Sequence, residues 1–247
     1  PKMSYDSTAG ADPLRWAGTA FQNQRLLHFH TCGIGVSPDR AAEGTPFIFT
    51  PYLEARMQGR TIVGYCGSIG LTNNLSDFVD YIEASRRDDV MFVIAGDGAD
   101  RARFQSRLGA CDNIVFLGRI SADQVQGFLR RCDVLFLSTL PSKVWDYGQS
   151  MNKVVDYMLA GKYIVAQYTG YPSFINEAAC GVFTDGAGLA ACLDDAIATP
   201  RAKRDAIGLA GFVFGYKEYE QALFPPNAWL LFGLPLVCIA VFEHRVL

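Results

Sequence analysis

The chain has 247 residues, of which 50% are hydrophobic and 19% are charged, and its formal net charge is -3. This length and composition are enough for one large folded domain with a full hydrophobic core. The small negative net charge gives no electrostatic sign of nucleic-acid binding, for which a basic face would be expected, and so argues against nucleic acid as a partner.

From residue 61 onward, short apolar runs alternate with amphipathic segments, which is typical of a parallel sheet covered by helices on both faces. The predicted strands are residues 62–66, 90–95, 114–117, 134–137, 163–167 and 182–183. The predicted helices are residues 75–87, 100–108, 121–131, 154–160, 172–178 and 187–198. The fold class is therefore α/β with a Rossmann-like parallel sheet. Ligands of such sheets bind at the carboxyl ends of the strands, where the loops 67–70, 117–120 and 138–150 fall.

Local signals refine two of these helices. In the helix at 75–87, Phe78, Val79 and Ile82 are spaced to face inward. In the helix at 121–131, Ser121 precedes Gln124 by three residues, which resembles a capping box.

The clearest candidate site is the segment 147–166, YGQSMNKVVDYMLAGKYIVA. Ser150 or Asn152 can serve as the N-cap of a helix that Gly161 ends. On that helix Asn152 and Asp156 are four residues apart, and Lys153 and Asp156 are three apart, so the three side chains share one face near the positive end. Such a helix start suits one phosphate and one hydroxylated sugar bound together.

This segment resembles the nucleotide-sugar signature of GT-B glycosyltransferases of the family 4 kind, in the variant that reads Ser-x-Asn-Lys-x-x-Asp-Tyr-Met-x-x-Gly-Lys. Such enzymes build capsular and other surface polysaccharides. Five further pieces follow the order of that family: IVGYCGSIG (62–70), VMFVIAGDG (90–98), NIVFLGR (113–119), CDVLFL (132–137) and ACGVF (179–183). A lone Gly-x-x-Gly or Gly-Asp-Gly is most often an ordinary turn, whereas the ordered series is specific. The resemblance covers roughly residues 61–199.

The resemblance implies the C-terminal, donor-binding half of a GT-B fold, with the N-terminal domain largely missing. Residues 1–60 are then a remnant of the first domain and a linker, residues 61–223 form the nucleotide-sugar-binding domain, and residues 224–247 form an apolar tail. Because a spanning helix needs about 20 apolar residues and this tail is interrupted by Pro235, a packed tail is favoured over a truncated membrane segment.

The resemblance also assigns the site. It implies donor binding by Gly67, Ser68, Gly70, Leu117, Arg119, Gln149, Ser150, Asn152, Lys153 and Asp156, with Lys153 and Asp156 as the catalytic pair. The family usually stabilises the diphosphate with an arginine and a lysine, but here those positions hold Ser68 and Asn73, so Lys153 is the expected substitute. A lysine at a helix start adds a point charge where backbone N–H groups already point.

The more common family motif has two glutamates, which here align with Gly148 and Asp156. Asp156 is expected to accept hydrogen bonds from the ribose hydroxyls. The donor-sugar contact of the first glutamate is left to Asp146, Gln149 or Ser150. Arg119 either stacks on the base or is a solvated loop cation.

No metal and no cofactor are expected. His28 and His30 form the only histidine pair and lack a third ligand nearby, and the family usually works without a metal. The seven cysteines are odd in number and contain no Cys-x-x-Cys spacing, which predicts reduced, buried thiols in a cytoplasmic protein.

The function implied is retaining transfer of a sugar from a nucleoside-diphosphate sugar, of UDP type, to a glycan or lipid-linked acceptor in surface-polysaccharide biosynthesis. The protein would then be cytoplasmic, with peripheral association at the inner face of the membrane left open. The family's general base lies in its first domain, so this chain alone is expected to be inactive.

Two alternatives stay open. A sugar-nucleotide epimerase of the same architecture needs acid and base carboxylates near residues 67–74, and the sequence offers none there. A non-catalytic nucleotide-binding module agrees with the missing cations but not with the intact Asn152, Lys153 and Asp156.

Overall fold

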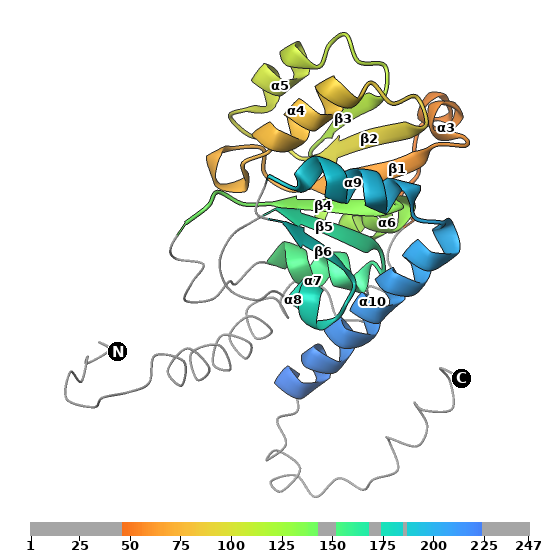
Figure 1. Ribbon diagram of the computed structural model, residues 1–247, viewed down its shortest axis with the longest axis vertical. Helices are drawn as coiled ribbons and strands as arrows, with labels where there is room; N and C mark the ends of the chain where they lie inside the picture. Colours follow the sequence, from red (N-terminus) through yellow and green to blue (C-terminus); the bar gives the residue numbers. More distant parts are fainter. Residues whose placement is uncertain (1–45, 143–151, 168–173, 185–186, 224–247) are drawn as a thin grey trace, which may run out of the picture.

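The computed structural model describes residues 46–142, 152–167, 174–184 and 187–223, with the side chains of residues 152 and 215–223 outside the description. Six parallel strands form one sheet in the order β3-β2-β1-β4-β5-β6 (Figure 1). The strands are β1 (Thr61–Cys66), β2 (Val90–Ala95), β3 (Ile114–Gly118), β4 (Val134–Ser138), β5 (Tyr163–Gln167) and β6 (Gly181–Thr184). The predicted Rossmann-like sheet is therefore confirmed.

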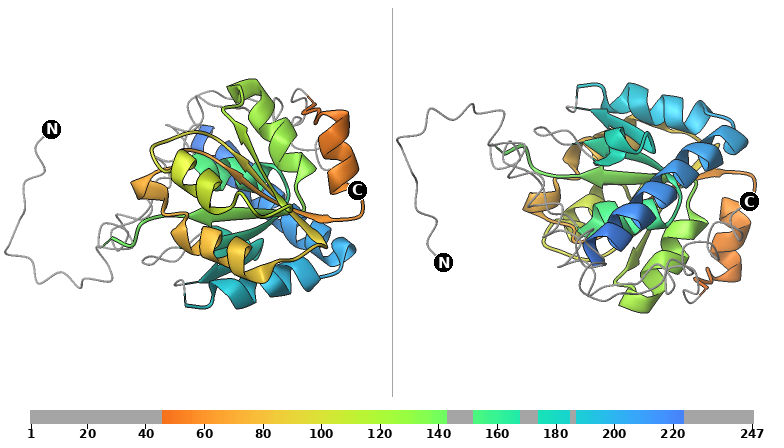
Figure 2. Two further views of the ribbon diagram at one scale, coloured as in Figure 1. Left: turned by 90° about the horizontal axis from the view of Figure 1, so that it is seen from above. Right: turned by 90° about the horizontal axis from the view of Figure 1, so that it is seen from below.

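Helices cover both faces of the sheet, as Figure 2 shows from two sides. On one face, α4 (Ser76–Ser85), α5 (Arg101–Arg107) and α9 (Leu189–Ala198) enclose one hydrophobic core. On the other face, α3 (Pro51–Met57), α6 (Ala122–Arg131), α7 (Asn152–Leu159) and α8 (Phe174–Glu177) enclose a second core. The turn η1 (Leu71–Asn73) follows β1, and the long α10 (Arg201–Leu223) packs across α7 and β5.

Strand β2 shows why both faces need cover. All six of its residues are buried. Met91, Val93 and Ala95 belong to the core beneath α6 and α7, whereas Val90, Phe92 and Ile94 belong to the core beneath α4 and α5. Because successive side chains of a strand point to opposite faces, a strand of continuous apolar residues is stable only when both faces of the sheet are buried from solvent.

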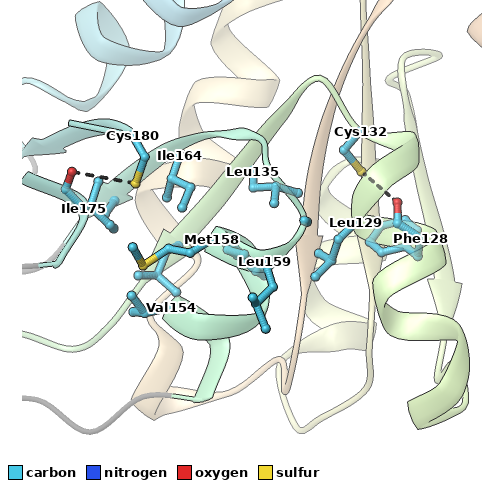
Figure 3. Packing of buried hydrophobic residues seen from close by; sticks show 14 of the residues in the cluster. Phe128, Leu129, Cys132, Leu135, Val154, Met158, Leu159, Ile164, Ile175 and Cys180 are labelled. Atoms are coloured by element: carbon cyan, nitrogen blue, oxygen red, sulfur yellow. Dashed lines mark hydrogen bonds between the residues drawn. The ribbon is translucent and has the colours of Figure 1, made fainter. Parts of the chain in front are cut away.

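Aliphatic and aromatic residues pack the α6–α7 side of the sheet (Figure 3). Val154, Met158 and Leu159 of α7 share this core with Leu135 and Ile164 of the sheet. At its two ends the thiols of Cys132 and Cys180 donate to the carbonyls of Phe128, at 3.5 Å, and Ile175, at 3.7 Å.

The thiol prediction holds only in part. Burial raises the pKa of Cys180 to about 12, so this thiol stays protonated, and Cys132 is equally buried. Cys66, Cys111 and Cys192 are also free, but they are only partly buried. Cys32 and Cys238 lie outside the described residues.

The observed ends of the predicted helices and strands lie within two residues of their predicted positions. Two helices and one capping interaction differ from the predictions. Helix α3 was not predicted; Thr50 accepts from the Leu53 N–H at 3.4 Å, and Pro51 opens the helix. Helix α10 was not predicted either. The predicted capping box is wrong, because the Ser121 Oγ and the Gln124 Oε1 contact each other at 2.9 Å instead of the backbone N–H groups.

No helix within the described ranges combines the length and the apolar character needed to cross a membrane. The apolar tail at 224–247 lies outside those ranges.

Candidate functional site

The strand order reverses between β1 and β4. These two strands pair in parallel, and the chain leaves β1 toward α4 on one face and β4 toward α7 on the other. Such a divergence at the carboxyl edge is where ligands of open α/β sheets bind. The loop after β1 and the first turn of α7 meet at this point.

The loop after β1 is held by backbone contacts with the neighbouring strand. The N–H of Gly67 donates to the carbonyl of Ala95 at 3.0 Å, and the N–H of Ile69 donates to that of Asp97 at 2.9 Å. A Cβ on Gly96 would lie 1.8 Å from the carbonyl oxygen of Gly67, and Gly96 has a φ of +140°. Gly96 of the Gly-Asp-Gly motif therefore allows the backbone after β2 to approach the loop after β1 closely. The motif affects the site by fixing the position of that loop.

The two glycines of that loop differ. Gly67 has a φ of +154°, and a Cβ on it would lie 2.7 Å from the Cε of Lys153. Gly70 has extended backbone with a φ of -167°, and a Cβ there would meet no atom within 4 Å. The geometry thus requires glycine at Gly67 but not at Gly70.

Lys153 reaches from α7 over the end of β1. Its Nζ donates to the hydroxyl of Tyr65 at 3.1 Å and to the Oδ1 of Asn73, and it lies 5.0 Å from the centre of the Tyr65 ring. The Nδ2 of Asn73 in turn donates to the Oγ of Ser68 at 2.6 Å. Of the two residues expected at the family's cation positions, Asn73 thus accepts from the ammonium of Lys153, and Ser68 is linked to it through Asn73.

The charge of Lys153 is poorly compensated. Burial lowers its pKa to about 8, while the neighbouring Cys66 thiol opposes this shift weakly. In the part of the chain that the structure describes, no carboxylate forms an ion pair with it. An anion placed beside the ammonium would raise the pKa again, which is the electrostatic property of a phosphate site.

Asp156 lies one turn further along α7. Burial raises its pKa to about 6, against the hydrogen-bonding side chain of Gln126. Burial raises the pKa of the Cys66 thiol at the end of β1, Asp156 raises it further, and Lys153 lowers it. Both charges of α7 therefore act on this strand end.

The other predicted residues lie in different places. Arg119 follows β3 with its side chain 84% exposed, and its Nε is 3.7 Å from a carboxylate oxygen of Asp97. Leu117 packs partly buried against the core beneath α6 and α7. Asn152 is the first residue of α7 and so lies inside the helix rather than before it, while Gln149 and Ser150 fall outside the described residues.

Sequence reasoning did not single out Tyr65 and Thr139. Tyr65 holds the lysine and donates to the Ser68 carbonyl at 2.7 Å. Thr139 follows β4 and is 4% exposed, and its buried hydroxyl meets no partner among the described residues. A polar residue directly after an apolar strand was the available signal for Thr139.

Within the described ranges, no three His, Cys, Asp or Glu residues are grouped to hold a metal ion.

With a Rossmann-like sheet and a buried lysine at its carboxyl edge defined, comparison with known proteins places the chain in a family. The sequence matches the family "Glycosyl transferases group 1" over residues 60–199, which is more than half of the chain, so the chain belongs to this family. No curated protein sequence matches it.

Solved structures share the fold. WaaG, a glycosyltransferase involved in lipopolysaccharide biosynthesis, is 17% identical with a TM-score of 0.57, over 77% of this chain and 54% of its own. HepE of Anabaena, solved with UDP and glucose, is 16% identical with a TM-score of 0.55, over 80% of this chain and 53% of its own.

The C-terminal domain of LpcC, a glycosyl transferase group 1 family protein from Francisella tularensis, is 16% identical with a TM-score of 0.57. This match covers 72% of the present chain and 97% of that domain. The present chain thus spans about half the length of WaaG and HepE but corresponds to nearly the whole of an isolated C-terminal domain.

Proposed function

We propose that this chain is the donor-binding half of a retaining glycosyltransferase that takes a sugar from a UDP-sugar. The observation that carries the proposal is the ammonium of Lys153 at the carboxyl end of β1, lying over Gly67 and lacking a carboxylate partner among the described residues. The presence of UDP and glucose in the HepE structure supports the choice of donor.

In the proposed site, the diphosphate lies between the loop at 67–70 and the first turn of α7. Lys153 and the free N–H groups of that turn stabilise the negative charge that develops on the departing diphosphate. Asp156 accepts from the ribose hydroxyls, and the backbone at Leu117 and Arg119 meets the base. Gln149, Ser150 and Asn152 remain proposed donor contacts on the loop that leads into α7.

The acceptor is proposed to be a glycan or a lipid-linked sugar of a surface polysaccharide, in keeping with the involvement of WaaG in lipopolysaccharide biosynthesis. The proposed transfer takes place in the cytoplasm, with peripheral association at the inner face of the membrane left open. The acceptor surface and the base would come from a further domain, so the division into residues 1–60, 61–223 and 224–247 remains part of this proposal.

Isothermal titration calorimetry of the chain with UDP, GDP and UDP-glucose in EDTA tests the donor site. We expect UDP to bind without a divalent metal, because the charge comes from Lys153. A strict requirement for magnesium or manganese, or the absence of any nucleotide binding, would contradict the proposed site. UDP binding with no transfer by a longer chain carrying a further domain would favour a non-catalytic nucleotide-binding module.

A further inference from the structure

A second cleft lies at the opposite end of the sheet, at the amino ends of β1 and β4. It has a volume of about 670 Å³ and lies among α3, the following turn, the last residue of α6 and the first turn of α10. In Figure 1, α3 and the start of α10 lie at the same end, away from the loop that follows β4. The strands between the two ends are about six residues long, so the cleft is roughly 20 Å from the donor site.

The lining of this cleft is rich in arginine. Its charged residues are Arg60, Arg131, Arg201 and Arg204 against Glu54 and Asp133, an excess of two positive charges. The whole chain, by contrast, carries a net charge of -3. The lining of the cleft is therefore positively charged although the chain as a whole is negatively charged.

Part of this charge is already neutralised. The Nη2 of Arg131 lies 2.6 Å and 2.7 Å from the two carboxylate oxygens of Glu54. The Oδ2 of Asp133 accepts from the Ile62 N–H at 2.8 Å. These contacts fix the amino ends of β1 and β4. They do not involve Arg60, Arg201 or Arg204, which also line the cleft.

Arg60, Arg201 and the start of α10 supply further donor groups. The guanidinium of Arg60 has no acceptor among the described residues. Arg201 is held loosely, with its Nε 3.8 Å from a carboxylate oxygen of Asp205 and its side chain 79% exposed. At the start of α10 the N–H groups of Lys203 and Arg204 donate to the carbonyl of Pro200 at 2.9 Å and 3.0 Å, which leaves the N–H groups of Arg201 and Ala202 without an acceptor in the described part of the chain.

Arg204 supplies the decisive observation. It is only 7% exposed, and its Nη1 donates to the carbonyl of Ile197 at 2.9 Å. Its Nε is buried and meets no acceptor in the described part of the chain. A buried guanidinium with an unpaired N–H is costly, and the negative charge of an oxyanion in the cleft, which Arg204 lines, would offset this cost.

We infer that this cleft is a binding site for a phosphate group, separate from the donor site. A tetrahedral oxyanion presents several acceptors at once, which suits guanidinium groups converging with a helix N-terminus. The phosphate belongs either to a soluble phosphomonoester or to the headgroup of an anionic lipid.

The test removes the two accessible arginines and leaves Arg204 in place, because Arg204 also holds the end of α9. The double variant Arg60→Gln/Arg201→Gln is titrated with inorganic phosphate by calorimetry beside the parent chain. We expect at least about 10-fold weaker phosphate binding and unchanged UDP binding. The control Arg86→Gln/Arg103→Gln removes equal charge from exposed positions elsewhere and should bind phosphate as the parent does.

The variant Lys153→Met separates this site from the donor site, because it should bind phosphate at the second cleft as tightly as the parent. The inference is overturned if the parent binds no phosphate at millimolar concentration, if the double variant binds it as tightly as the parent, or if Lys153→Met abolishes it. Sedimentation with phosphatidylglycerol and phosphatidylcholine vesicles distinguishes the sources. Phosphate-sensitive binding to phosphatidylglycerol vesicles identifies a headgroup, and phosphate binding without vesicle binding identifies a soluble ligand; either result supports the site.

Discussion

Replacing Lys153 by methionine removes the one ammonium group that lies at the carboxyl end of β1 in the described structure. Methionine fills a similar volume, so the packing of α7 on the sheet should persist. A hydrogen bond to a charged group contributes about 1.5–3 kcal/mol, so we expect UDP affinity to fall roughly 10- to 100-fold. Calorimetric titration with UDP measures this loss directly.

The stability of this variant should change little, because two effects oppose each other. The loss of Nζ leaves the Oδ1 of Asn73 without its donor in a residue that is 7% exposed, which costs about 1–3 kcal/mol. Removing a buried cation with a pKa lowered to about 8 restores a comparable amount. Lys162→Met, beyond the other end of α7, is the matched control and should keep UDP affinity. Parent-like UDP affinity of Lys153→Met with an unchanged melting temperature would refute the role of Lys153.

The remaining predictions concern pH, the ribose and the loop. Because burial sets the pKa of Lys153 at about 8, UDP affinity should fall as the pH rises through about 8, where the free amine loses its proton; Lys153→Arg should abolish this dependence in the same titration. Asp156→Asn should weaken UDP about 10-fold and leave pyrophosphate unchanged, so equal losses for both ligands would argue against ribose recognition. Gly96→Ala should lower the free energy of unfolding by about 2–5 kcal/mol in urea denaturation, because its Cβ would overlap the Gly67 carbonyl. Gly59→Ala, with a φ of +76° and open space, should cost only about 1–2 kcal/mol, and similar losses in both variants would show that backbone strain alone is responsible.

Sequence periodicity was sufficient for the sheet because its signals are local. Strands β2 and β5 were predicted with their observed bounds, since a continuous apolar run can only be stable with both faces buried. The end of the helix before Gly161 was predicted because glycine readily adopts the positive φ that ends many helices. Gly161 does have a φ of +65°. Helix α3 was missed because the residues before 61 match the family weakly, although Thr50 and Pro51 form an ordinary helix start.

The sequence by itself determined the α/β class, the helix that carries Lys153 and Asp156, and the absence of the family's usual cations at Ser68 and Asn73. Only the tertiary structure decided that Lys153 contacts Asn73, because this contact joins residues 80 apart in the chain. It also decided that Gly96 supports the loop through its backbone and that Arg204 lies buried beside a second cleft. Hydrophobic patterning reports which face of an element is buried, whereas the meeting of polar groups from different elements depends on strand order and register, which no local pattern contains.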